Sequence, residues 1–173
     1  MLALMFPTHV AMGYLIGVYS RLPVVYLVVG SALPDLLDRP LYYLGVTPLP
    51  HTVGHSLFVA VPVCALAVYF WGDRGVALAV GWLAHLLTDA LNVLTTQGPA
   101  MAPYYVLYPL ERPDTRRDLW TVTIELPVTD VTHTVTPVVL GAETVLLAAA
   151  GWVCYRRGKA KGVFPHPRNH EPE

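Results

Sequence analysis

The chain has 173 residues, of which 54% are hydrophobic and 13% are charged. A typical soluble domain carries about 25% charged residues, so this composition argues against an ordinary soluble domain and favours a membrane protein. The net charge of −1 provides no basic field, so nucleic acid is not an expected partner.

Five apolar blocks, taken in chain order, predict an all-α fold: a polytopic helical membrane bundle of about five spans. A span needs roughly 20 mostly apolar residues. The second block is the shortest, and Pro34 interrupts it, which predicts a kink or an end near the membrane interface. The blocks cover residues 2–19, 22–37, 52–71, 76–94 and 137–155.

The remaining residues predict one long external loop and a tail. Residues 95–136 form the longest polar connection, in which the alternating stretches TVTIEL and VTDVTHTV predict a short β-hairpin. Residues 156–173 are basic at first and then contain proline and histidine, which predicts a disordered tail. The predicted organisation is a transmembrane domain over residues 1–155, with an extracytoplasmic loop at 95–136, followed by a cytoplasmic tail.

Lysine and arginine placement predicts the orientation in the membrane. When the loops alternate, seven basic residues fall on the side of the tail and four on the other side. Cytoplasmic loops carry the excess of basic residues. We therefore predict a multi-pass plasma-membrane protein with a cytoplasmic C-terminus. The seven are Arg21, Arg74, Arg156, Arg157, Lys159, Lys161 and Arg168, and the four are Arg39, Arg112, Arg116 and Arg117.

Ionisable residues fall at particular ends of the apolar blocks. Such residues are costly inside a span and usually mark a functional site. They lie at the start of the first and third blocks and at the end of the second and fourth blocks, which up-and-down threading places on one side of the membrane, the external one. The predicted cluster comprises His9, Asp35, Asp38, His51, His55, His85 and Asp89.

The spacing of these residues favours a metal site. His51 and His55 are four residues apart behind Pro50, which suits the first turn of a helix, and His85 and Asp89 are also four apart. Each pair would share one helix face. Imidazole nitrogens and carboxylate oxygens are ligands of zinc, manganese and iron. We predict a divalent metal, with zinc as the first expectation and manganese or iron as alternatives, bound by His9, Asp35, His51, His55, His85 and Asp89.

Each polar residue also has a plainer interpretation. His9 alone could be an ordinary interfacial histidine, and the aspartates of PDLLD could simply end a helix. Glu143 could pair with a histidine of the cluster or face the bundle interior. His133 is expected to be a solvated loop residue, and Ser56 to serve helix packing rather than to act as a nucleophile. The metal interpretation depends on all seven residues meeting in one place.

The motifs THVAMGYLIG, GSALPDLLD, HTVGHSL, GWLAHLLTDALNVLTTQG and YPLERP, in this order, resemble the YdjM-like (DUF457) family of membrane-bound metal-dependent hydrolases. The resemblance covers roughly residues 8–112 and implies the same seven polar positions. The order of the motifs is also similar, more loosely, to zinc-dependent phospholipase C. Family members commonly carry a basic residue where this chain has Thr52. If that residue binds phosphate in the family, the resemblance does not extend to substrate binding at this position.

The sequence thus predicts a hydrolase of an ester or phosphoester, such as that of a lipid, at the outer face of the bilayer. The metal would lower the pKa of water, and Asp38 or Asp89 would serve as general base. Tyr104, Tyr105 and Tyr108 are expected at headgroup level, and no substrate-binding residue is predicted. The alternatives are metal or ion transport, which needs polar groups that reach the opposite face, and a structural metal that joins the helices.

Overall fold

The computed structural model describes residues 5–47, 51–97, 106–109, 122–125, 132–135 and 137–160. This part of the chain is helical apart from one pair of short strands, so the predicted all-α class is confirmed. In chain order the elements are α1 (Met5–Tyr19), α2 (Val24–Tyr43), α3 (Leu57–Trp71), α4 (Asp73–Gln97), β1 (Val122–Glu125), β2 (Thr132–Val135) and α6 (Pro137–Ala160).

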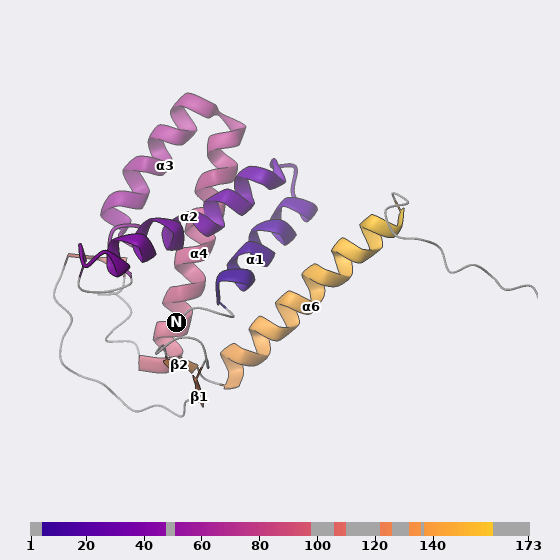
Figure 1. Cartoon of the computed structure of the whole chain (residues 1–173). Helices are drawn as coiled ribbons and strands as arrows, with labels where there is room; N and C mark the ends of the chain where they lie inside the picture. Colours follow the sequence, from indigo (N-terminus) through magenta and orange to yellow (C-terminus); the bar gives the residue numbers. More distant parts are fainter. Residues whose placement is uncertain are drawn as a thin grey trace, which may run out of the picture.

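Helices α2 and α4 form the centre of the molecule. Helix α2 packs against α1 and α4, α3 packs against α4, and α6 packs against α1 (Figure 1). Strands β1 and β2 pair antiparallel, with Val122 opposite Val135, and β2 contacts α4. The helices therefore enclose a common interior, with α6 on its outside.

Glycines let the backbones of α2 and α4 approach closely. A Cβ atom added at Gly30 would collide with the carbonyl oxygen of Leu78, and one added at Gly81 would collide with the carbonyl oxygen of Leu27. Small residues at a helix interface permit this kind of contact in membrane proteins. The close approach brings the polar end of α2 next to α4.

We expect Gly81→Ala to destabilise the protein by roughly 1–3 kcal/mol, because overpacking forces the two backbones apart. A matched control is Gly141→Ala on α6, where an added Cβ meets nothing within 4 Å. Alanine is the better helix former, so the control should leave stability unchanged or raise it by up to about 1 kcal/mol. Thermal unfolding in detergent measures both variants, and an equal loss in the two would contradict the packing described here.

Two helical segments are long and apolar enough to cross a membrane, Asp73–Thr95 and Pro137–Lys159. Helices α1 and α3 have 15 residues each. At 1.5 Å per residue they are about 22 Å long, shorter than a hydrocarbon core of about 30 Å. Helix α2 has 20 residues but contains two aspartates, an arginine and two prolines. By length and composition, the described helices thus account for two of the five predicted spans.

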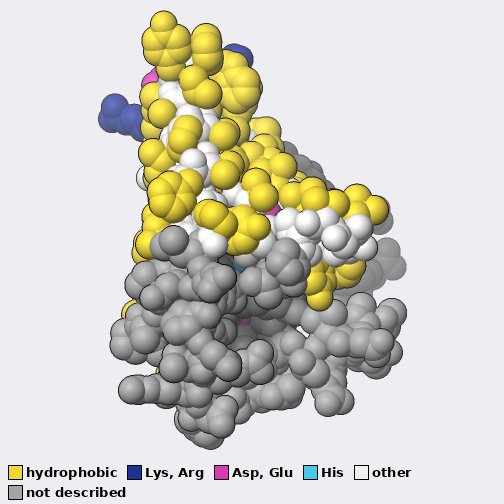
Figure 2. Space-filling view, turned by 90° about the vertical axis from the view of Figure 1, so that its left-hand side faces the viewer, with side chains coloured by type: hydrophobic (Ala, Val, Ile, Leu, Met, Phe, Trp, Pro, Cys, Tyr) yellow, Lys and Arg dark blue, Asp and Glu magenta, His cyan; other side chains and the backbone are white. Residues whose placement is uncertain are grey.

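Large apolar side chains remain exposed on two helices. Only 11% of the apolar segment of α6 is buried inside the molecule, against 56% for that of α4. On α3, the side chains of Phe58, Leu66, Tyr69, Phe70 and Trp71 are exposed. Figure 2 shows hydrophobic side chains over much of the described surface on this side, with basic side chains visible only near one end. Contiguous apolar surfaces of this kind are uncommon on monomeric soluble proteins.

The third helix begins later than the sequence predicts. Residues 51–56 form a turn, and α3 begins at Leu57 with Ser56 as its N-cap. The Ser56 hydroxyl accepts a hydrogen bond from the amide of Phe58 at 3.2 Å, which is the usual role of serine at this position. The prediction that His51 and His55 share a helix face was therefore wrong, because the serine cap follows both histidines.

The last helix ends later than predicted. Helix α6 continues past Tyr155 to Ala160, so the segment predicted as a tail begins with helical residues. Arg157 and Lys159 lie in its last turn, where basic charge favours the helix dipole. The Arg157 guanidinium also donates a hydrogen bond to the carbonyl of Val18 at 3.2 Å, which links the end of α6 to the end of α1. The predicted disorder concerns residues 161–173, which lie outside the described residues.

Candidate metal centre

The seven polar residues predicted to converge lie together where α1, α2, α4 and the turn before α3 meet. All are buried except His51, which is half-buried. We call this group the histidine–aspartate cluster. It comprises His9 from α1, Asp35 and Asp38 from α2, His51 and His55 from the turn, and His85 and Asp89 from α4.

Asp89 lies at the centre of the cluster. Its Oδ1 atom is 3.1 Å from Nε2 of His9. Its Oδ2 atom is 3.1 Å from Nε2 of His55 and 3.2 Å from Nε2 of His85. One carboxylate therefore faces three imidazole nitrogens that come from three different segments of the chain.

Asp38 fixes the orientation of His55. Nδ1 of His55 is 2.8 Å from Oδ2 of Asp38, and the same carboxylate accepts hydrogen bonds from the amides of Thr52 at 2.7 Å and Gly54 at 2.8 Å. An ionised carboxylate only accepts hydrogen bonds, so Nδ1 of His55 carries the proton in this pair. In the neutral ring, Nε2 of His55 then presents a lone pair toward Asp89.

A backbone carbonyl fixes His85 in the same way. Nδ1 of His85 is 2.7 Å from the carbonyl oxygen of Ser31 on α2. Because a carbonyl oxygen can only accept, Nδ1 of His85 is the donor, and Nε2 of the neutral ring carries a lone pair. Pro34, inside α2, has no amide hydrogen. The carbonyl of Gly30, four residues earlier and directly before Ser31, therefore lacks its usual helical hydrogen bond.

With both rings neutral, three acceptor atoms meet in one place, whereas a proton on Nε2 of His55 would let it donate to Asp89. Nε2 of His55 is 3.0 Å from Nε2 of His85, and both lie within 3.2 Å of Oδ2 of Asp89. Lone pairs at this separation repel, and the buried setting leaves little water to screen them. A cation removes the repulsion. With metal–ligand distances of about 2.0–2.2 Å, neighbouring ligand atoms of a tetrahedral site lie about 3.3–3.6 Å apart, so small outward shifts of these atoms would admit a divalent ion.

Two groups within the cluster could hold a metal ion. His9, His85 and Asp89 offer ligand atoms that lie within 4.8 Å of one another, and so do Asp35, His51 and His55. The groups adjoin through His55, because its Nε2 atom faces His85 and its ring meets that of His51 edge to face, with centroids 4.5 Å apart. The arrangement has room for either one ion or two neighbouring ions.

Further contacts hold the turn that carries His55. The indole Nε1 of Trp82 donates a hydrogen bond to the carbonyl of Gly54 at 2.8 Å. A Cβ atom at Gly54 would lie 2.6 Å from the carbonyl oxygen of Pro34, so only glycine lets the turn lie this close to α2. The Ser56 hydroxyl donates to the carbonyl of Tyr108 at 2.8 Å, which commits its proton and favours the structural role expected for it.

Sequence reasoning missed two of the residues that build the site. Ser31 contributes its backbone carbonyl oxygen to the site. Every residue has such a carbonyl, so the residue type does not reveal this role. Trp82 does have a signal, because it lies three residues before His85 and so shares the helix face of the cluster. A buried indole N–H needs a partner, and that partner is the turn.

Glu143 approaches the cluster from α6. It is buried and lies close enough to His9 and Asp89 to interact with them electrostatically. Among the described residues, neither its Oε2 atom nor Nδ1 of His9 has a hydrogen-bond partner. The predicted contributions of Tyr104, Tyr105 and the His133 side chain lie outside the described residues.

In comparisons with known proteins, no family model, no curated protein and no solved structure matches this chain.

Proposed function

We propose that this protein is a membrane-embedded metal-dependent hydrolase of esters or phosphoesters. In this proposal His9, His55, His85 and Asp89 hold a divalent ion, with zinc the first expectation and manganese or iron the alternatives. The observation that carries the proposal is the meeting of two imidazole Nε2 atoms and a carboxylate oxygen at 3.0–3.2 Å, with both rings held through Nδ1. Outer partners that fix a ring in this manner are typical of metal-binding histidines.

The chain's own groups divide the work in the proposed reaction. A bound divalent ion supplies Lewis acidity, which polarises an ester or phosphoryl oxygen and activates water. Both oxygens of Asp38 are engaged by amides and by His55, so we assign it to positioning rather than to the general-base role. Asp35 belongs to the second metal-binding group and also lines a surface pocket. Its Oδ2 atom accepts a hydrogen bond from Arg39, so its Oδ1 atom is the one that we assign to accept a proton from water.

The membrane part of the proposal rests on the exposed apolar helices. Helix α6 is apolar and scarcely buried, and α3 exposes large apolar side chains. Membrane lipid would cover the exposed apolar surfaces of α3 and α6, so no partner protein is needed to bury them. Helices α1 and α3, with 15 residues each, would complete a five-span bundle together with α2 if the bilayer thins locally around them. We therefore propose a multi-pass protein of the plasma membrane.

Contacts at the ends of the helices support the proposed orientation. The Arg74 guanidinium lies over the ring of Tyr26, 5.8 Å from its centroid, and Arg157 bonds the carbonyl of Val18. These contacts gather the end of α1 and the starts of α2 and α4 with the basic end of α6. The positive-inside tendency places that side in the cytoplasm and the histidine–aspartate cluster outside. The resemblance of the motifs to the YdjM-like (DUF457) family supports the proposed metal-dependent hydrolase activity.

A chelation experiment tests this function. Purified protein in detergent is assayed against short-chain carboxylic and phosphoric esters before chelation, after chelation, and after zinc, manganese or iron is restored. We expect chelation to lower the rate by more than ~100-fold, because the metal stabilises the transition state by several kcal/mol, and we expect one of the three metals to restore it. Hydrolysis that survives chelation unchanged would defeat the proposal.

Two other functions would use the same cluster. Metal transport requires polar groups that lead to the opposite face, and Glu143 is the one buried acidic residue that the described part of α6 offers. A structural metal requires all coordination positions to be closed by protein. Metal uptake into proteoliposomes would identify the first, and tight metal binding without any turnover would identify the second.

A further inference from the structure

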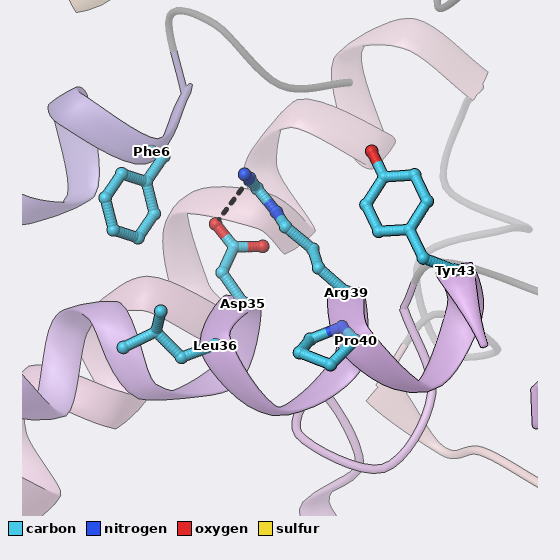
Figure 3. Close-up of a pocket in the computed structure, with 6 residues that line it drawn as sticks. All are labelled: Phe6, Asp35, Leu36, Arg39, Pro40 and Tyr43. Atoms are coloured by element: carbon cyan, nitrogen blue, oxygen red, sulfur yellow. Dashed lines mark hydrogen bonds and ion pairs between the residues drawn. The ribbon is translucent and has the colours of Figure 1, made fainter.

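A pocket opens beside Asp35 along the last two turns of α2. It has a volume of about 350 Å³ and is lined by Phe6, Asp35, Leu36, Arg39, Pro40 and Tyr43 (Figure 3). Pockets for small molecules have volumes of about 300–1,000 Å³, mostly apolar walls and a few polar groups that set orientation. Four of the six residues that line this pocket are apolar or aromatic, one is a carboxylate and one is a guanidinium.

Arg39 is held in place on two sides. Its Nη2 atom donates a hydrogen bond to Oδ2 of Asp35 at 2.8 Å, and its guanidinium carbon lies 5.4 Å from the centroid of the Phe6 ring. Figure 3 shows the guanidinium reaching across Asp35 with Phe6 beside it. Among the described residues, this is the one hydrogen bond that the group makes. A guanidinium has five N–H donors, so others are available to a ligand.

Asp35 connects this pocket to the candidate metal centre. It lines the pocket and also belongs to the group formed with His51 and His55. A molecule seated in the pocket would therefore reach the metal-binding residues with the end that contacts Asp35. The rest of the lining is apolar or aromatic: Leu36 lies with Phe6 at one end, and Pro40 and Tyr43 lie toward the other end (Figure 3).

We propose that this pocket binds a phosphate group that carries an apolar chain, with Arg39 on the phosphate and Leu36 among the apolar residues that contact the chain. A preorganised guanidinium matches the geometry of phosphate oxygens, and its positive charge attracts an anion. The inference rests on the proposed hydrolase function and narrows its substrate class to phosphoesters of amphiphiles.

A binding experiment tests this proposal separately from catalysis. The full chain in phosphatidylcholine nanodiscs is titrated with dihexanoyl phosphatidic acid and with inorganic phosphate, with and without zinc. We expect Arg39→Gln to weaken binding of the lipid roughly 10- to 100-fold, as loss of a charged hydrogen bond does, and Arg39→Lys to weaken it less. Arg21→Gln, at an exposed arginine between α1 and α2, is the matched control and should bind as the parent does.

A second variant tests the chain-binding side. Leu36→Trp partly fills the pocket without touching the charged groups, so it should weaken binding of the lipid several-fold and leave that of inorganic phosphate unchanged. Bound zinc is measured in every variant. If Arg39→Gln loses zinc, Arg39→Lys and Leu36→Trp still decide the question, because both keep a charge beside Asp35.

Each result has a distinct meaning. No binding of either probe to a zinc-loaded parent, or equal binding by parent and Arg39 variants, would overturn the phosphate site while leaving the metal centre intact. If lipid binding depends on Arg39 but not on Leu36, the proposed amphiphilic ligand is wrong and the pocket is an anion site only. If lipid binding depends on both residues but the protein takes up no metal, the binding pocket is confirmed and the proposed metal-dependent hydrolysis is wrong.

Discussion

Asp38→Asn is expected to weaken metal binding roughly 10- to 100-fold, the usual effect of losing the partner that orients a metal-binding histidine. Oδ2 of Asp38 accepts from the Thr52 amide and from His55, and Oδ1 accepts from the Gly54 amide. An amide nitrogen in either place would meet an N–H donor. The ring of His55 would then change its tautomer or turn away, and its Nε2 lone pair would leave the cluster.

Three measurements on this variant separate positioning from proton transfer. Zinc affinity is measured by competition with a chelator, hydrolysis is followed in parallel, and ¹⁵N NMR of labelled histidine reports which nitrogen of His55 carries the proton. We expect all three to change together. A variant that keeps the parent's zinc affinity and tautomer but loses hydrolysis would contradict the positioning role and return Asp38 to the general-base role first expected of it.

Asp89→Asn is expected to abolish metal binding, with an affinity loss of more than ~100-fold, yet to preserve the fold of the metal-free protein. The carboxylate is the one anionic group that faces His9, His55 and His85 together. An amide is a much weaker ligand for zinc. Its NH₂ group can, however, donate to the lone pairs of His55 and His85, which relieves their repulsion.

The stability of this variant distinguishes a metal from a proton. If the histidines were instead held by protonation, Asp89→Asn would break a buried ion pair and cost about 3–5 kcal/mol. Thermal unfolding of metal-free parent and variant measures the difference. The matched control is Asp73→Asn, the same change at an exposed position in the first turn of α4. It should alter stability by less than about 1 kcal/mol and leave zinc binding unchanged.

The convergence of the cluster could be predicted from chain direction alone. When helices alternate in direction, the start of one and the end of the next lie together, so His9, Asp35, His55 and His85 had to meet if their blocks were helices. The identity of the donor atoms also followed from the residue types. These two arguments use only periodicity and chemistry, both of which the sequence contains.

The roles inside the cluster could not be predicted. Asp38 and Asp35 are both aspartates near the end of α2, yet one accepts from the turn before α3 and the other pairs with Arg39. Which partner each finds depends on the path of the turn, and Ser56 sets that path by beginning α3 after both histidines. Pro50 favoured an earlier start, and the serine cap outweighed it.

The Arg39 pocket was also beyond the reach of sequence reasoning. Arg39 follows Asp38 directly and was counted only as a basic residue of an external loop. In the structure it lies inside α2, four residues after Asp35, where an ion pair along the helix forms readily. The contact with Phe6 of α1 depends on how α1 and α2 pack, which no local pattern encodes.

Bound metal in the purified full-length protein tests the central claim most directly. Elemental analysis after zinc loading and removal of excess ion is compared between the parent and a His85→Ala/Asp89→Ala double variant. We expect near-stoichiometric zinc, manganese or iron in the parent and its loss in the variant. A parent that takes up no metal after loading, together with a variant of unchanged thermal stability, would contradict the account and leave these residues a hydrogen-bonding role.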